Sequence, residues 1–94
     1  MRENEIERRL AVSVKRMGGM AVKFVSPGLA GVPDRIVLLP GRKIAFVELK
    51  ALGKKPRPQQ IKRMRQLECL GFPVYVVDRV EQIGGVLDDI ENSV

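Results

Sequence analysis

The stretch GVPDRIVLLPGRKIAFVELK, residues 31–50, decides the fold of this chain. Two apolar runs, Asp34–Leu39 and Lys43–Leu49, flank the three residues PGR, and a loop of that length commonly joins two antiparallel strands. We therefore predict a hairpin in which Leu39 pairs with Lys43. This register places Asp34 directly opposite Glu48 at the open end of the hairpin.

Side chains alternate between the two faces of a strand, so the register also predicts what each face carries. Asp34, Glu48 and Lys50 share one face with apolar neighbours. The opposite face is apolar too, with the set Val37, Leu39, Ala45, Val47 and Leu49. A hairpin that is apolar on both faces is expected inside a sheet that is covered on both sides.

Apolar periodicity extends this hairpin into one α/β domain over residues 1–94. The predicted elements are a helix over residues 3–17, strands over 20–25, 34–39 and 43–49, a helix that begins near Pro58 and ends at Gly71, a strand over 74–78, and a helix over 80–92. Their order is α-β-β-β-α-β-α. The helix between the third and fourth strands predicts a mixed β-sheet core flanked by helices.

Composition excludes several classes of protein. The chain has no histidine, which removes imidazole-dependent catalysis and the usual zinc sites. Its sole cysteine, Cys69, fits a reducing compartment, and the charged start MRENEIERRL does not resemble a signal peptide. Since no apolar run is long enough to span a membrane, we expect a cytoplasmic protein.

The charge distribution points to a polyanion as partner. The formal net charge is +6, and the segment from Arg42 to Arg65 holds nine basic residues and one acid, Glu48. A basic stripe of this kind is typical of nucleic-acid binding, although a basic surface that serves only solubility remains the alternative.

The predicted register has a chemical consequence at the open end of the hairpin. Directly opposed residues have Cβ atoms roughly 4.5–5.5 Å apart, so the carboxylates of Asp34 and Glu48 repel each other unless positive charge compensates them. Lys50 supplies one charge, and a bridging Mg²⁺ or Mn²⁺ would supply more, with the backbone carbonyl of Leu49 as a further ligand. The alternative is a structural ion pair of Lys50 with either acid.

Pro33-Asp34 followed by Glu48-Leu49-Lys50 matches the PD-(D/E)xK nuclease signature. The pieces GVPD and FVELK, followed by a glutamine in a later helix, resemble the VRR-NUC family, which includes small stand-alone phage and bacterial proteins. The resemblance spans nearly the whole chain. It implies a restriction-endonuclease-like fold and metal-dependent hydrolysis of phosphodiester bonds.

The same resemblance assigns roles to individual residues. Asp34 and Glu48 correspond to the metal-binding carboxylates, and Lys50 corresponds to the lysine that assists the attacking water. Gln60 fits the helix glutamine because Met64 and Leu67 follow it at the family's spacing, whereas Gln59 does not fit. The first-helix glutamate corresponds to Glu7, with Glu3 as the other possibility, and a solvated charge remains the alternative for Glu7.

Six basic residues after the hairpin suit phosphate contacts, which are independent of sequence: Lys54, Lys55, Arg57, Lys62, Arg63 and Arg65. The few aromatic residues lie in or beside predicted strands, so base stacking has little support. We expect recognition of DNA shape. The resemblance implies branched or four-way (Holliday) junction DNA as substrate, and the small size of the chain together with the resemblance implies a homodimer as the active form. The alternatives are a nuclease that needs a partner for targeting and a non-catalytic nucleic-acid-binding domain.

Overall fold

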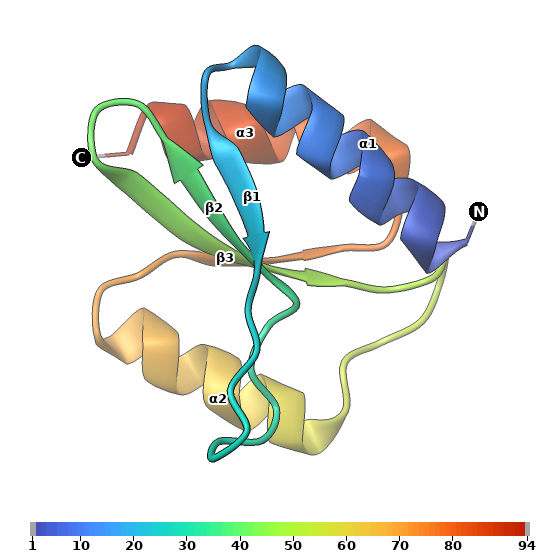
Figure 1. Ribbon diagram of the computed structural model, residues 1–94. Helices are drawn as coiled ribbons and strands as arrows, with labels where there is room; N and C mark the ends of the chain where they lie inside the picture. Colours follow the sequence, from blue (N-terminus) through green and yellow to red (C-terminus); the bar gives the residue numbers. More distant parts are fainter. Residues whose placement is uncertain (1, 94) are drawn as a thin grey trace.

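In the computed structural model, which describes residues 2–93, a four-stranded sheet lies between two layers of helices (Figure 1). The elements are α1 (Glu3–Arg16), β1 (Met20–Lys23), β2 (Arg35–Leu39), β3 (Lys43–Leu49), α2 (Pro58–Cys69), β4 (Val74–Val77), η1 (Val80–Gln82) and α3 (Ile83–Glu91). The predicted order of helices and strands is confirmed. The helix predicted over residues 80–92 divides into a 3₁₀ turn and an α-helix, because the side chain of Gln82 accepts hydrogen bonds from the backbone N–H groups of Asp78 and Arg79.

The sheet has the strand order β1-β2-β3-β4. The first three strands are antiparallel, and β4 runs parallel to β3 after the crossover through α2. The pairing of Leu39 with Lys43 confirms the predicted hairpin register. Gly41 and Arg42 both have positive φ angles, of 83° and 65°, in the loop that reverses the chain. This loop fixes the register all along β2 and β3, and so fixes which residues meet at their far ends.

One face of the sheet packs against α1 and α3 and forms the main core. The helix residues Ile6, Leu10 and Val14 are fully buried there. They meet the alternating strand residues of β2 and β3 and the buried side of α3. Burial of this apolar surface supplies most of the stabilisation, because each fully buried aliphatic side chain contributes about 1.5–3 kcal/mol.

On the other face of the sheet α2 is the covering helix (Figure 1), and the rings of Phe24 and Phe72 also pack against Phe46 there. Ile44 of β3 is 40% exposed and Val76 of β4 is 37% exposed, although both lie on apolar strands. Helices therefore lie on both faces of the sheet, as predicted, and parts of the face under α2 stay exposed. Among residues 2–93, none of the helices combines the length and apolarity that a membrane span requires.

Candidate active site

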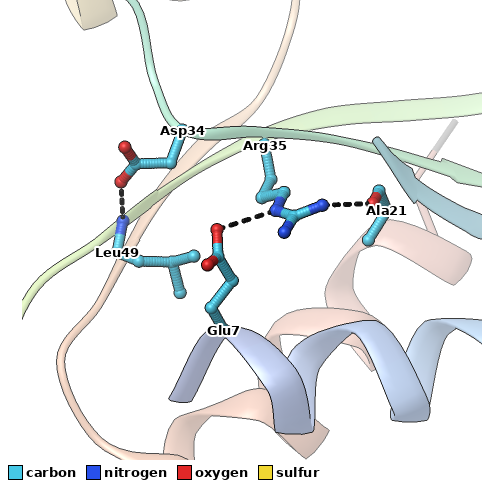
Figure 2. Close-up of polar contacts among 5 residues, drawn as sticks. All are labelled: Glu7, Ala21, Asp34, Arg35 and Leu49. Carbon is cyan, nitrogen blue, oxygen red and sulfur yellow. Dashed lines mark hydrogen bonds and ion pairs between the residues drawn. The ribbon is translucent and has the colours of Figure 1, made fainter. Parts of the chain in front are cut away.

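Asp34 lies immediately before β2 and reaches across to the end of β3. Its Oδ2 accepts a hydrogen bond of 2.8 Å from the backbone N–H of Leu49, as Figure 2 shows. Its own backbone carbonyl accepts a hydrogen bond of 2.9 Å from the N–H of Phe24, which extends the pairing of strands β1 and β2 by one residue. These two contacts hold the Asp34 carboxylate at the carboxyl end of β3, beside Glu48.

Glu48 is the one buried polar residue among residues 2–93, and it is only 1% exposed. Its Oε2 accepts a hydrogen bond of 2.7 Å from Gln60 Nε2 and lies 3.2 Å from Lys50 Nζ. Its Oε1 is also buried, and no hydrogen-bond donor within residues 2–93 reaches it. An unsatisfied buried acceptor costs about 1–3 kcal/mol, so this oxygen is an unusual feature that calls for a ligand.

The electrostatics of the site agree with that geometry. Burial raises the pKa of the Glu48 carboxyl above its ordinary value of 4.5, and the negative charge of Asp34 raises it further. Lys50 acts in the opposite direction and does not cancel the other two effects. The cluster of two carboxylates and one ammonium is therefore short of positive charge.

A hard divalent cation fits this arrangement. The buried Oε1 of Glu48 has no hydrogen-bond donor among residues 2–93, and Asp34 provides a second carboxylate at the same end of the sheet. Within residues 2–93 there is no cluster of three or more His, Cys, Asp or Glu side chains that could hold a metal ion. Two protein carboxylates completed by water and phosphate oxygens are the usual way in which Mg²⁺ is bound.

Gln60 connects the site to the N-terminus of α2. Its Oε1 accepts a hydrogen bond of 2.8 Å from the backbone N–H of Arg57, while its Nε2 donates to Glu48. The neighbouring Gln59 is exposed. Of the two glutamines, the structure therefore brings Gln60 to the carboxylates, as the sequence spacing predicts.

Glu7 is not brought to the carboxylate pair. Its Oε2 lies 2.9 Å from Arg35 Nε, and Arg35 Nη1 donates to the backbone carbonyl of Ala21 at 2.8 Å (Figure 2). The reason is the alternation of the strand: Arg35 follows Asp34 and points to the opposite face of the sheet, where α1 lies. Glu3, the other possibility, is exposed in the first turn of α1.

Arg35 is a residue that the sequence reasoning missed. It ties α1 and β1 to the start of β2, one residue after Asp34. The sequence did indicate which way Arg35 points. Successive side chains of a strand face opposite sides of the sheet, so a basic residue next to Asp34 must face away from the carboxylate site. Which acid on α1 it meets could not be read from the strand pattern alone.

The predicted phosphate-binding residues divide into two groups. Five of them are exposed and free to contact a ligand: Lys54, Lys55, Arg57, Lys62 and Arg65. Arg63 is partly buried, and its Nε donates a hydrogen bond of 2.9 Å to the carbonyl of Ala30. It therefore fastens α2 to the loop between β1 and β2.

That loop forms one wall of a groove of about 590 Å³ beside the site. The other wall is the start of α2, including Arg57 and Gln60. Gly31 makes the close approach possible: its φ is +81°, and a Cβ there would lie 2.9 Å from the carbonyl oxygen of Gln59. The groove gives an extended ligand access to the residue that contacts Glu48.

Comparisons with known proteins agree with these features. The chain is 53% identical over 78 residues to "Putative nuclease p44" of Acyrthosiphon pisum secondary endosymbiont phage 1, covering 83% of this chain and 84% of that protein. A solved structure described as "VRR_NUC domain" superposes with a TM-score of 0.85 and 29% identity, covering 92% of this chain and 94% of the other. A second, described as "VRR_NUC domain protein", has a TM-score of 0.72 and 22% identity over 96% and 88% of the two chains, and shows likeness of fold alone. No family model matches the chain.

Proposed function

The chain belongs to the VRR-NUC family of nucleases, and on this premise we propose that it is a Mg²⁺- or Mn²⁺-dependent endodeoxyribonuclease that hydrolyses phosphodiester bonds in branched DNA. The observation that carries the metal dependence is the buried Oε1 of Glu48, which no donor reaches within residues 2–93, next to Asp34. Glu48 and Asp34 would hold the ion. The backbone carbonyl of Leu49 would be a further ligand of the ion. The N–H and C=O of a strand residue point to the same side, and the Leu49 N–H faces Asp34.

The bound ion would lower the pKa of a water molecule and neutralise charge on the scissile phosphate. The chain itself provides the positioning. Lys50 Nζ lies 3.2 Å from Glu48 Oε2 and its side chain is only 16% exposed, which supports a role in which its ammonium would stabilise the negative charge that develops on the phosphorane. Gln60 keeps Glu48 oriented by its hydrogen bond, and the N-terminal turn of α2 keeps Gln60 in place.

The preference for branched DNA and the homodimer are parts of the same proposal. A surface of 6141 Å² leaves little room around the site for holding a branched substrate. Two copies of the chain would bring two active sites to the substrate, one for each DNA strand to be cut. The apolar residues left exposed near α2, among them Leu70 at 73% and Ile44 at 40%, offer surface that a second copy would cover. Light scattering would give twice the mass of one chain, and a fully active monomer would contradict the dimer.

The test compares a four-way junction, a linear duplex and a single strand, each with Mn²⁺ and with EDTA. We expect Mn²⁺-dependent cleavage of the junction above the other two, and no cleavage by Asp34→Asn or Lys50→Ala, while both variants still bind the junction. Lys23→Ala, at an exposed position on β1, is the matched control and should cut normally. Equal cleavage of all three substrates would refute the structure selectivity, and full activity of Asp34→Asn would refute the assigned site.

A further inference from the structure

A second basic surface lies on the outer side of α1, where this helix meets η1 and α3. It is a groove of about 460 Å³ lined by three arginines, Arg8, Arg9 and Arg16, together with Val12 and Gly84. None of the residues that line it is acidic. All three arginines are exposed, and among residues 2–93 none of them takes part in an ion pair.

The helix dipole does not account for the whole of this concentration of charge. From Arg8 to Arg16 the helix carries four basic residues and no acid. Lys15 and Arg16 lie in the last turn, where positive charge interacts favourably with the helix dipole. That effect fades within one turn, so it does not reach Arg8 and Arg9. Like charges held around one groove repel each other unless an anion binds between them.

We propose that this groove binds phosphate groups of a nucleic acid, as a contact surface additional to the basic residues of α2. The guanidinium group forms two parallel hydrogen bonds to a phosphate, which suits a site built from arginines. The wall contributed by α3 is open at Gly84, where a Cβ would meet no atom within 4 Å. A phosphate-sized group can therefore approach the arginines from that side.

The position of the groove identifies which nucleic acid it binds. It lies on the α1–α3 layer, whereas Lys62 and Arg65 belong to α2 on the other side of the sheet (Figure 1). The protein measures 32 × 31 × 21 Å, and a duplex is stiff over about 150 bp, so a straight duplex follows one side of such a body. Contact with both surfaces requires a second duplex arm. This inference rests on the proposed action on branched DNA and names the surface that would recognise the branch.

The test uses two substitutions at one position. Gly84→Glu places a carboxylate among the arginines, and Gly84→Gln adds the same bulk without charge. Both fill open space and favour the helix over glycine, so both variants should fold, which circular dichroism would verify. Fluorescence anisotropy in EDTA then measures binding of a four-way junction and of a linear duplex without cleavage.

We expect Gly84→Glu to weaken junction binding roughly tenfold or more relative to Gly84→Gln, with a smaller effect on the duplex. Replacing the three arginines by glutamine should lower the slope of log K against log salt by about 2–3, since each phosphate contact contributes about 0.9. Equal junction affinities for the two Gly84 variants would overturn the proposal, and equal weakening on junction and duplex would overturn the role of a second arm. Because these measurements need no cleavage, failure of the groove is distinguishable from failure of the nuclease assignment, which only the Mn²⁺ assay decides.

Discussion

Replacing Glu48 by glutamine should make the metal-free protein more stable, although it removes a residue of the proposed site. In the native protein two carboxylates face one ammonium, and the Oε1 of Glu48 is buried without a donor from the described part of the chain, residues 2–93. A glutamine keeps an oxygen for Gln60 and Lys50 and turns an N–H group toward Asp34. The cluster of two carboxylates and one ammonium has a net charge of −1. Replacing one carboxylate by a neutral amide brings this charge to zero.

The magnitude follows from the unsatisfied oxygen. Relief of one buried unsatisfied acceptor amounts to about 1–3 kcal/mol in the free energy of unfolding. In a domain of this size each 1 kcal/mol moves Tm by roughly 4–8 °C. Thermal unfolding in EDTA at pH 7.5 should therefore give Glu48→Gln a Tm at least about 4 °C above that of the native protein. Glu68→Gln, which removes an exposed acid from α2, is the matched control and should leave Tm nearly unchanged.

The dependence on pH has a definite sign. The pKa of Glu48 is raised in the folded protein, so the protonated carboxyl favours folding and the ionised one opposes it. This contribution is fully present below the ordinary value of 4.5 and is lost as pH rises through the folded-state pKa. The advantage of Glu48→Gln should accordingly be full at neutral pH and disappear in acid.

Addition of Mn²⁺ should make the native protein more stable than Glu48→Gln. An ion at 100 times its Kd stabilises the native chain by about 2.7 kcal/mol, and it should stabilise Glu48→Gln far less. Two results would refute the reasoning: a lower Tm for Glu48→Gln in EDTA at neutral pH, or the same Mn²⁺ shift in both proteins. The first would mean that Glu48 is well satisfied without a cation.

Three further measurements test other parts of the structure. Tyr75 is the sole tyrosine, and burial together with its hydrogen bond to Asp89 raises its pKa to about 12. An ultraviolet titration should find the midpoint of Tyr75 ionisation at that pKa, and Asp89→Asn should lower it. The native protein should lose stability as pH rises from the ordinary tyrosine pKa of 10.0 toward the pKa of Tyr75 in the folded protein. Gly31→Ala should cost about 1–3 kcal/mol because φ is +81° and the new Cβ meets Gln59, whereas Gly28→Ala, with open space around it, should be nearly neutral in urea unfolding. Gln60→Ala should lower the free energy of unfolding by about 1.5–3 kcal/mol through loss of its hydrogen bond to Glu48, and an equal loss in Gln59→Ala would contradict the assignment.

The register of the hairpin was predictable because two local signals agree. The PGR loop sets the pairing of Leu39 with Lys43, and a slip of one residue would turn every apolar side chain to the wrong face. Once that pairing is fixed, Asp34 and Glu48 must meet at the same end of the sheet. The choice of Gln60 over Gln59 came from the resemblance to the nuclease family, because Met64 and Leu67 follow Gln60 at the family's spacing.

Contacts between layers were not predictable in the same way. The pairing of Glu7 with Arg35 depends on how α1 is rotated and shifted over the sheet, which no local pattern fixes. The bond from Arg63 to Ala30 depends on the path of the loop between β1 and β2. The exposure of Ile44 depends on how much of a sheet one helix covers, and an apolar pattern says only that a residue can be buried.

The position of the unsatisfied oxygen is itself informative. Glu48 lies on a strand whose residues from Ala45 to Leu49 are all buried, where an apolar residue or an amide would be less costly than an acid. The surrounding contacts do not remove that cost: Gln60 and Lys50 both act on Oε2 and leave Oε1 without a donor. A buried carboxylate with one oxygen held and the other open is oriented for a ligand, because rotation to satisfy the second oxygen would break the bonds to the first. Under the proposed function, the same bonds that hold Glu48 would prepare the site for a cation, and the lower stability at this end of the sheet would be the consequence.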